Sequence, residues 1–387
     1  MLSYLIPDVV CATLHNCEYS YKPSNTYMDA SESVFVITGA THGLGRACAM
    51  ELAQVSGGYV VLACRNLSDA SKLANTIYKD FNVKKGRVIV LEEPLNLCEE
   101  TSVRKYALLL SNWLKSNSKT IKTLINNAGL GQVPFSTNSR GYEMVFATNY
   151  LGHFMLTILL LPHIHGRIIN VSSGTHDPDL ESPLPDPGIA YPKTESEYVV
   201  QALYGQVPFA EGMKAREMRY TRTKLFLVLF TYELARRVDG SYPLYISNDV
   251  KKAVRDLPYG DSCKLPDAKS LSAVAIDPGL LLETNMFSKI FGPIIAFILW
   301  LLIPLLRMIP YFRRWIRTMK ESSHHLTKLA MFPDLGVTAG YFVDGKAVPS
   351  SEFSLSLDGL TKHAVMLWDL SIQWSMLTDK EIEAAGL

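Results

Sequence analysis

The chain has 387 residues and 48% of them are hydrophobic, which excludes wholesale disorder and allows one large α/β domain or two small ones. Its 38 Lys and Arg residues balance 37 Asp and Glu residues, so the overall charge gives no reason to expect nucleic-acid binding. The six cysteines include no CxxC pair, and we interpret them as reduced thiols of a cytosol-facing protein.

Residues 1–32 lack a basic start followed by a long apolar core, so we expect an N-terminal extension rather than a signal peptide. After this extension, short apolar runs alternate with helical patterns. The apolar runs predict strands at 33–38, 59–64, 87–92, 123–127, 167–173 and 271–276. The segments between them predict helices at 45–55, 69–81, 102–115 and 142–161.

Strands that alternate with helices of this length are typical of βαβ units, and uniformly apolar strands fit a sheet covered on both faces. The predicted fold is therefore α/β, a Rossmann-type doubly wound parallel sheet with helices on both faces. We expect residues 33–387 to form a single domain with inserts at about 174–215, 239–270 and 285–335. Inserts that follow the carboxyl ends of strands can shape a ligand site without disturbing the sheet.

A glycine-rich turn joins the first predicted strand to the first predicted helix. In the stretch VFVITGATHGLGRA, it contains Gly39, Gly43 and Gly45. Glycines permit a tight turn and close approach of a pyrophosphate, and the following helix supplies free N–H groups. The strand before the turn and the helix after it are the context that a dinucleotide site requires.

The residue after the second strand indicates which nicotinamide cofactor is bound. An acid about 20 residues beyond the glycines would select NAD through the ribose 2′-hydroxyl. The strand ends at Cys64, which is not an acid, and Arg65 follows it. A cation there can hold a 2′-phosphate, which predicts NADP(H); the alternative is a solvated surface arginine. His42 in the turn could add a donor or be only a turn residue.

Tyr220 and Lys224 stand four residues apart in YTRTK and share one face of an expected helix. This spacing occurs by chance in many helices, so it does not establish a site by itself. Carbonyl reduction needs a proton donor, and a nearby ammonium lowers the pKa of a phenol from its ordinary value of about 10. The pair therefore predicts a phenol tuned for proton transfer.

The ordered set of motifs resembles the short-chain dehydrogenase/reductase family. The turn TGATHGLG at 38–45 precedes NNAG at 126–129, TNYLGHF at 148–154, INVSS at 169–173, the Tyr–Lys pair, and DPG at 277–279. The resemblance covers roughly residues 33–375. The stretches YEMVFATNYLGHFMLT and AGYFVDGK are most similar to the retinol dehydrogenase and protochlorophyllide reductase branch.

The resemblance implies a role for each matching residue. Ser173 would orient the substrate oxygen, with Ser172 as the competing assignment, while Tyr220 transfers the proton. Lys224 would tune Tyr220 and contact the nicotinamide ribose. Asn149 would support a water-linked proton relay to the lysine, or it is simply a buried polar group. Besides Tyr220 and Lys224, the cofactor-binding residues would be Gly39, Thr41, His42, Gly43, Leu44, Gly45, Arg65, Asn96, Leu97, Asn127, Ala128, Gly129, Pro278, Gly279 and Thr284.

The chain departs from the family pattern in several places. Asn96 stands where an aspartate usually receives the adenine amino group, and its amide oxygen can still accept a hydrogen bond. The threonine expected after the Pro-Gly pair falls on Glu283, and we choose Thr284 instead. Tyr220 follows Ser173 by 47 positions, which is long for the family.

Residues 290–306 are the most apolar part of the chain and carry no charge. Pro293 and Pro304, and the position inside the fold, argue against a membrane-spanning helix. Either an apolar lid over a hydrophobic substrate or contact of 290–320 with a membrane surface would explain the segment. In the second case, Arg313, Arg314 and Arg317 would meet anionic headgroups.

The sequence thus predicts an NADP(H)-dependent oxidoreductase that acts on the carbonyl or alcohol of a bulky, retinoid-, steroid- or lipid-like molecule. We expect it in the cytoplasm or on the cytosolic face of an internal membrane, and a homodimer is left open. The histidine pairs at 163–165 and 324–325 lack further ligands at suitable spacing, so no metal is expected. The alternatives are a non-catalytic NADP(H)-sensing protein and a membrane-surface scaffold on the same fold.

Overall fold

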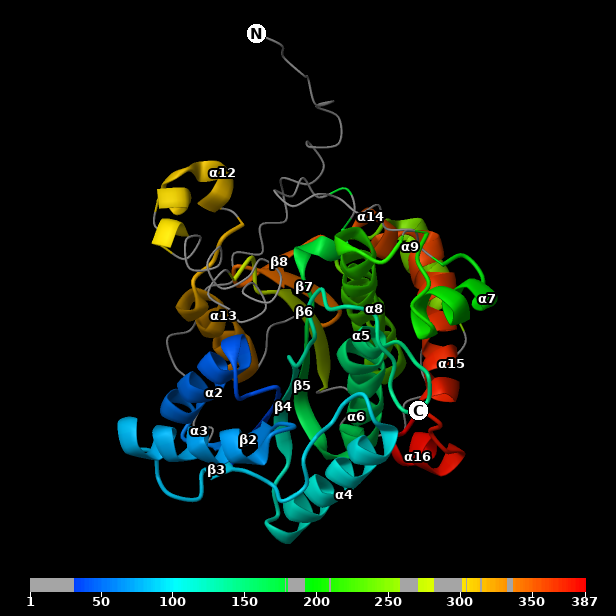
Figure 1. Ribbon diagram of the computed structural model, residues 1–387. Helices are drawn as coiled ribbons and strands as arrows, with labels where there is room; N and C mark the ends of the chain where they lie inside the picture. Colours follow the sequence, from blue (N-terminus) through cyan, green and yellow to red (C-terminus); the bar gives the residue numbers. More distant parts are fainter. Residues whose placement is uncertain are drawn as a thin grey trace.

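The computed structural model describes the chain from residue 31 onward, with gaps. The described residues are 31–177, 179, 192–208, 210–257, 271–281, 301–303, 305–313, 315–332 and 337–387. Across them, eight strands form one sheet in the order β3-β2-β1-β4-β5-β6-β7-β8 (Figure 1). The strands are β1 Val34–Thr38, β2 Tyr59–Ala63, β3 Val88–Ile89, β4 Ile121–Asn126, β5 Ile164–Val171, β6 Ser272–Asp277, β7 Gly340–Val343 and β8 Lys346–Val348.

The strand pairs are parallel from β3 to β7, and β8 runs antiparallel to β7. Side chains of β1 alternate between two hydrophobic clusters, one on each face of the sheet: Val34 and Val36 belong to one, and Phe35 and Ile37 to the other. All four are fully buried. The prediction of a doubly wound, mostly parallel sheet is therefore confirmed.

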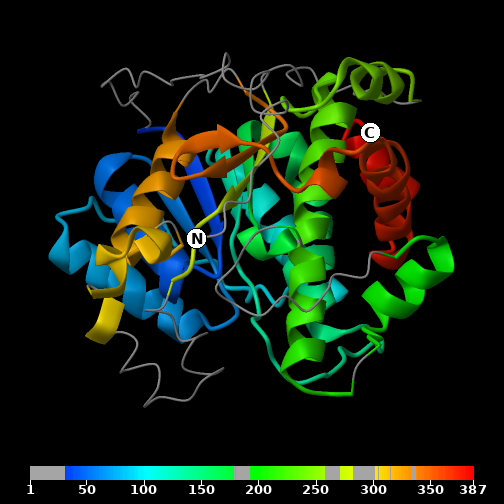
Figure 2. The same cartoon turned by 90° about the horizontal axis from the view of Figure 1, so that it is seen from above.

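Helices cover both faces of the sheet, as Figure 2 shows from above. On one face lie α2 (Gly43–Val55), α3 (Leu67–Asp80) and α13 (Met319–Met331). The other face carries α4 (Glu100–Ser116), α6 (Gly152–Leu160) and the long α8 (Met213–Asp239). Beyond α8 lies α15 (Ala364–Trp374), and α16 (Asp379–Ala384) follows it.

Shorter helical segments complete the described chain. They are α5 (Met144–Phe146), the π turn η1 (Ala147–Leu151), η2 (Leu161–His163), η3 (Gly174–His176), α7 (Glu195–Tyr198), η4 (Val199–Leu203), α9 (Asn248–Arg255), α12 (Pro310–Arg313), α14 (Glu352–Leu355) and η6 (Gly359–His363). In both views α12 lies on the opposite side of the molecule from α15.

Several predicted boundaries were wrong. The strand expected at 87–92 is only Val88–Ile89, because the following residues leave the sheet. The single helix expected at 142–161 is divided into α5, a π turn and α6. The β7–β8 hairpin was missed, although Asp344 and Gly345 form a turn with positive φ angles of 52° and 73°, the Asp-Gly signal of a tight hairpin.

The sheet order places the functional region. The chain runs from β1 to β2 on one side of β1, and then crosses to β4 on its other side. In open α/β sheets, ligands bind at the carboxyl ends of the strands where the strand order reverses in this way. The turn after β1 and the segments that follow β4, β5 and β6 therefore converge on one crevice.

Candidate functional site

A cavity of about 1190 Å³ opens at the carboxyl ends of the parallel strands. Its wall includes parts of the turn after β1, the segments after β2, β4, β5 and β6, and one face of α8. The predicted site residues that line it are Gly39, Thr41, His42, Gly43, Leu44, Arg65, Asn96, Leu97, Asn127, Ala128, Gly129, Ser173, Tyr220, Lys224, Pro278 and Gly279. Gly45 and Asn149 lie outside this lining, and Thr284 and Glu283 lie outside the described residues.

The glycine turn is held tightly against the segment that follows β4. Gly39 has a positive φ angle of 67°, and a side chain on it would come within 2.9 Å of the Ala128 Cα atom. A Cβ atom on Gly45 would lie 2.4 Å from Asn127 Nδ2. The His42 side chain does not cap the start of α2, and the first two residues of this helix, Gly43 and Leu44, line the cavity. This arrangement fits a pyrophosphate.

Thr38, the last residue of β1, joins three elements of the site. Its hydroxyl oxygen accepts hydrogen bonds from the backbone N–H groups of Asn127 and Ala128, both at 2.9 Å. It also lies 2.9 Å from Nε2 of His153 on α6, which is fully buried. The other ring nitrogen of His153 lies 2.9 Å from the Asn149 carbonyl oxygen. Sequence analysis did not assign a role to Thr38 or His153.

Asn149 lies in the π turn and is fully buried. Its side-chain oxygen accepts a hydrogen bond from the Leu130 N–H at 2.7 Å. Its amide nitrogen donates to the Leu130 carbonyl at 2.9 Å and to the Thr223 hydroxyl at 3.2 Å. The side chain therefore fixes the loop after β4 to α8, and these bonds do not include Lys224.

The two serines at the end of β5 have different environments. Ser172 is buried, and its hydroxyl donates to the backbone carbonyl of Lys224 at 2.8 Å. Ser173 is only partly buried in the cavity wall, and its hydroxyl hydrogen-bonds with Tyr220. It also accepts from the Thr175 N–H at 3.3 Å. This geometry favours Ser173 as the serine that meets a substrate.

Tyr220 and Lys224 lie on one face of α8, with the Lys224 Nζ atom 5.5 Å from the centre of the Tyr220 ring. The ammonium donates to the Val171 carbonyl at 2.8 Å, and burial lowers its pKa to about 8 while Asp277 opposes this shift. The expected lowering of the Tyr220 pKa is not what the structure gives. Burial raises this pKa most, the Asp277 carboxylate raises it further, and the hydrogen bond with Ser173 lowers it.

Arg65 is exposed at the edge of the cavity, directly after the buried Cys64. The next residue, Asn66, caps α3 by accepting a hydrogen bond from the Asp69 N–H at 3.2 Å, which fixes the backbone beside Arg65. The Asn96 side-chain oxygen accepts from the Cys98 thiol at 3.3 Å. Both predicted cofactor contacts thus lie on the cavity wall.

The comparisons with known proteins agree with this geometry. The family model for short chain dehydrogenases matches residues 33–179. Retinol dehydrogenase 11 of Homo sapiens is 34% identical over 212 residues, which cover 54% of this chain and 57% of that protein. Retinol dehydrogenase 14 of Mus musculus is 28% identical over 328 residues, which cover 80% of this chain and 77% of that protein. The chain therefore resembles short-chain dehydrogenases over residues 33–179 and is similar to retinol dehydrogenases.

A solved structure extends the likeness of the fold to most of the chain. L-sorbose reductase of Gluconobacter frateurii, complexed with NADPH and L-sorbose, has a TM-score of 0.52 at 19% identity. The alignment covers 83% of this chain and 98% of that one. The match to human retinol dehydrogenase 11, in contrast, spans little more than half of that relative's length.

The candidate site contains further polar residues that sequence analysis missed, namely Asp277, His176 and Tyr341, which all line the cavity. His176 lies 2.7 Å from the Ser173 carbonyl oxygen through Nδ1 and accepts from the Ser351 N–H at 3.1 Å through Nε2. Burial lowers the pKa of this imidazole to about 4, so it is neutral near pH 7. Asp277 is the first residue of the DPG motif, so a signal for it was present in the sequence.

The backbone after DPG is held in place by a second segment of the chain. Gly279 has a positive φ angle of 77°, and a Cβ atom there would lie 2.4 Å from Arg317 Cγ. Leu280 donates to the Trp315 carbonyl at 2.8 Å, and the Pro278 carbonyl accepts from the Ser322 hydroxyl at 2.6 Å. Residues 315–317 thus hold the backbone after DPG in place, and Trp315 itself lines the cavity.

Proposed function

We propose that this protein is an NADP(H)-dependent oxidoreductase that transfers a hydride between the nicotinamide and the carbonyl or alcohol of a bulky hydrophobic substrate. The observation that carries the proposal is the placement of Ser173, Tyr220 and Lys224 in the cavity that the glycine turn also lines. The free N–H groups at the start of α2 and the close backbone approach at Gly39 and Gly45 fit the pyrophosphate of a dinucleotide.

Each residue of the set has a part in carbonyl reduction. When bound, the nicotinamide supplies the hydride. Ser173 donates a hydrogen bond to the substrate oxygen, and Tyr220 gives that oxygen its proton as negative charge develops. The Lys224 ammonium favours the phenolate that remains. In alcohol oxidation the phenolate of Tyr220 takes the proton, and the same contacts act in reverse.

The preference for NADP(H) rests on Arg65. Its guanidinium stands at the cavity edge beside the end of β2, where a ribose 2′-phosphate would lie, and no acid occupies the end of this strand. A guanidinium binds a phosphate through charge-assisted, bidentate hydrogen bonds.

A hydrophobic substrate is favoured by one apolar part of the cavity lining. Its walls are formed by the segment after β6, residue 315 and the β7–β8 hairpin. The apolar side chains there are those of Leu280, Leu281, Trp315, Val343, Val348 and Pro349. Retinoid-, steroid- and lipid-like carbonyls and alcohols suit such a lining.

We further propose that the helical residues around 301–309 contact a membrane surface. The enzyme would then be found in the cytoplasm or on the cytosolic face of an internal membrane, and the contact favours the second location. Leu301, Leu305 and Met308 follow helical spacing and are 63%, 60% and 78% exposed. On the inner side, Ile303 packs with Ile316. The side chain of Arg317 does not support the expected headgroup contact, because it is buried and paired with Asp344.

A long apolar helix elsewhere in the chain does not bear on this contact. Residues Met144–His163 could cross a membrane by length and composition, but 83% of the most apolar window is buried within the protein. They belong to the core that α5, η1 and α6 form against the sheet.

The alternatives are a non-catalytic NADP(H) sensor and a membrane-surface scaffold. Neither needs a hydrogen-bonded Ser173–Tyr220 pair with a lysine behind it, and the chain has all three residues in one cavity. This arrangement favours the enzyme.

The test is turnover of NADPH with a panel of hydrophobic ketones and aldehydes. We expect Tyr220→Phe to lower turnover by at least about 100-fold, since it removes the proton donor, and to leave NADPH binding unchanged. Tyr204→Phe is the matched control, because Tyr204 is exposed and lies outside the cavity. Turnover by Tyr220→Phe at the wild-type rate would rule the proposal out.

A further inference from the structure

Asp277 places a carboxylate beside the residues proposed to transfer the proton. It is the last residue of β6, and its neighbour Ile276 pairs with Val171 on β5. The carbonyl of Val171 accepts the hydrogen bond from the Lys224 ammonium at 2.8 Å. Asp277, Lys224 and Tyr220 also line the same cavity, so the strand register brings all three to one wall.

The protein holds this carboxylate in place through its backbone. The Gly279 N–H donates to Asp277 Oδ1 at 2.9 Å, and the Gly174 N–H also hydrogen-bonds to it. Gly279 can turn back towards the carboxylate because its φ angle is positive, at 77°. These bonds use the N–H groups of segments after β5 and β6, and they do not involve the ammonium of Lys224.

The charges around Asp277 come from each element packed against it. These groups are Tyr220 and Lys224 from α8, His176 and Asp177 from the segment after β5, Tyr341 from β7, and Arg317 from the segment before α13. The imidazole of His176 is neutral near pH 7, and Arg317 is paired with Asp344. Burial raises the pKa of Asp277, whereas the hydrogen bonds from the Gly279 and Gly174 N–H groups lower it and so favour the carboxylate. Lys224 is a buried cation that lines the same cavity, and this carboxylate can balance its charge.

We propose that the Asp277 carboxylate is a positioning residue of this site: it balances the Lys224 ammonium and holds Tyr220 as the protonated phenol. A negative charge near a phenol disfavours the phenolate, so Asp277 opposes the action of the lysine on Tyr220. The resting site is then set to donate a proton, which is the role that carbonyl reduction requires. The inference rests on the proposed function.

The test compares Asp277→Asn with the wild type in the pH dependence of both reaction directions. Asparagine keeps the size and the acceptor oxygen for Gly279 but loses the charge. The loss of the reduction rate with rising pH should occur about one pH unit lower in Asp277→Asn than in the wild type, and so should the gain of the oxidation rate. At a fixed pH within either transition, this shift is a roughly tenfold change in rate. Asp277→Glu, which keeps the charge, should restore the wild-type profile.

Asp369→Asn is the matched control, because Asp369 is mostly exposed and pairs with Arg237 on the outer side of α8. It should leave the pH dependence of both reaction directions unchanged. The inference would be overturned if the two transitions of Asp277→Asn stayed at the wild-type pH or moved to higher pH. Thermal unfolding with and without NADPH separates this effect from a loss of folded protein.

A second measurement does not depend on turnover. The measurement is NMR of protein whose tyrosines are labelled at the ζ carbon. The resonance that is missing in Tyr220→Phe belongs to Tyr220, and its chemical shift reports the ionisation of this side chain. It should titrate at lower pH in Asp277→Asn than in the wild type, and equal midpoints would overturn the inference. An inactive wild-type enzyme would contradict the proposed function, whereas an active one with equal midpoints contradicts only the role of Asp277.

Discussion

Arg65 is the residue on which the choice of cofactor depends. It is exposed at the cavity edge, while Asn66 fixes the backbone next to it by capping α3. A charge-assisted hydrogen bond contributes about 1.5–3 kcal/mol, so Arg65→Ala should weaken NADPH binding by roughly 10- to 150-fold. NADH lacks the 2′-phosphate and should bind almost equally well to both proteins.

The measurement is the Kd of each cofactor by titration. Arg46→Ala is the matched control, since Arg46 is exposed on α2 outside the cavity, and it should change neither Kd. Equal losses of NADPH and NADH binding in Arg65→Ala would mean that Arg65 does not contact the phosphate.

At this scale, spacing along the chain was enough to predict some site residues but not others. Tyr220 and Lys224 share a helix face, and the glycine turn is continuous in sequence, so both could be identified locally. Asp277 and His176 enter the site through the pairing of β5 with β6 and through contacts with the chain beyond β8. A sequence contains no direct record of such pairings, so the balance of charge around Tyr220 could not be predicted.

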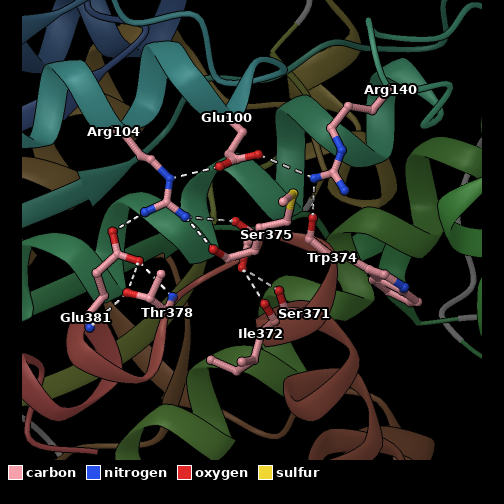
Figure 3. A network of polar contacts seen from close by, with 10 residues as sticks. Glu100, Arg104, Arg140, Ser371, Ile372, Trp374, Ser375, Thr378 and Glu381 are labelled. Atoms are coloured by element: carbon pink, nitrogen blue, oxygen red, sulfur yellow. Dashed lines mark hydrogen bonds and ion pairs between the residues drawn. The ribbon is translucent and has the colours of Figure 1, made fainter.

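At the scale of elements, a network of polar contacts connects the C-terminal helices α15 and α16 to α4 (Figure 3). Arg104 on α4 donates from Nε to Glu100 at 2.8 Å, and it pairs with Glu381 near the start of α16. It also donates to the Met376 carbonyl in the turn between α15 and α16. Arg140 adds a bond to the Trp374 carbonyl at 2.8 Å. The Trp374 carbonyl is the last of α15, and a helix leaves its last C=O groups without a partner inside the helix.

We expect Arg104→Ala to lower the free energy of unfolding by about 1–3 kcal/mol, since it leaves Glu381 and the helix-end carbonyls with fewer partners. Denaturant unfolding measures the change. Lys105→Ala is the control on the same helix, because Lys105 is exposed, and its effect should be within about 0.5 kcal/mol. Equal stabilities of the two variants would show that the network does not hold the helices.

Most parallel strands and their crossover helices could be predicted because each has a local pattern of buried residues. The long α8 lacks such a local pattern of buried and exposed residues. It is buried on nearly all sides, between the sheet and α15, so its sequence has no clear polar face. The π turn at Ala147–Leu151 depends on the Asn149 and His153 contacts with other elements, and helical periodicity does not reveal it.

At the scale of the whole molecule, the exposed apolar side chains around 301–309 predict binding to membranes. A triple variant in which Glu replaces Leu301, Leu305 and Met308 should no longer float with liposomes that contain phosphatidylserine. The wild type should float, and should do so less with neutral phosphatidylcholine, because Arg313 and Lys320 are exposed nearby.

Leu108→Glu is the control, since Leu108 is 64% exposed on α4, far along the chain from this surface. It should float as the wild type does. Flotation of the triple variant at the wild-type level, or no flotation of the wild type with either lipid, would contradict the proposed membrane contact.

Stability of the whole fold should fall as the pH drops below the ordinary histidine pKa of about 6.5. Burial lowers the pKa of His153 and of His176 to about 4 in the folded protein. Between these values the unfolded chain binds more protons than the folded chain, so the free energy of unfolding decreases as the pH falls from 6.5 towards 4. The two groups together should account for a loss on the order of a few kcal/mol.

Denaturant unfolding at several pH values from 7.5 down to 4.5, an interval of roughly three units, measures the slope of the free energy of unfolding against pH. His153→Gln removes one of the two groups, so the slope should be shallower even if the variant is less stable throughout. His165→Gln removes an exposed imidazole and should keep the wild-type slope. The comparison isolates the buried imidazole because carboxylates with raised pKa values, such as that of Glu143, act in the opposite direction in all three proteins. If His153→Gln kept the full slope, protonation of His153 would not be linked to unfolding, and the bond between Thr38 and α6 would have to survive in acid.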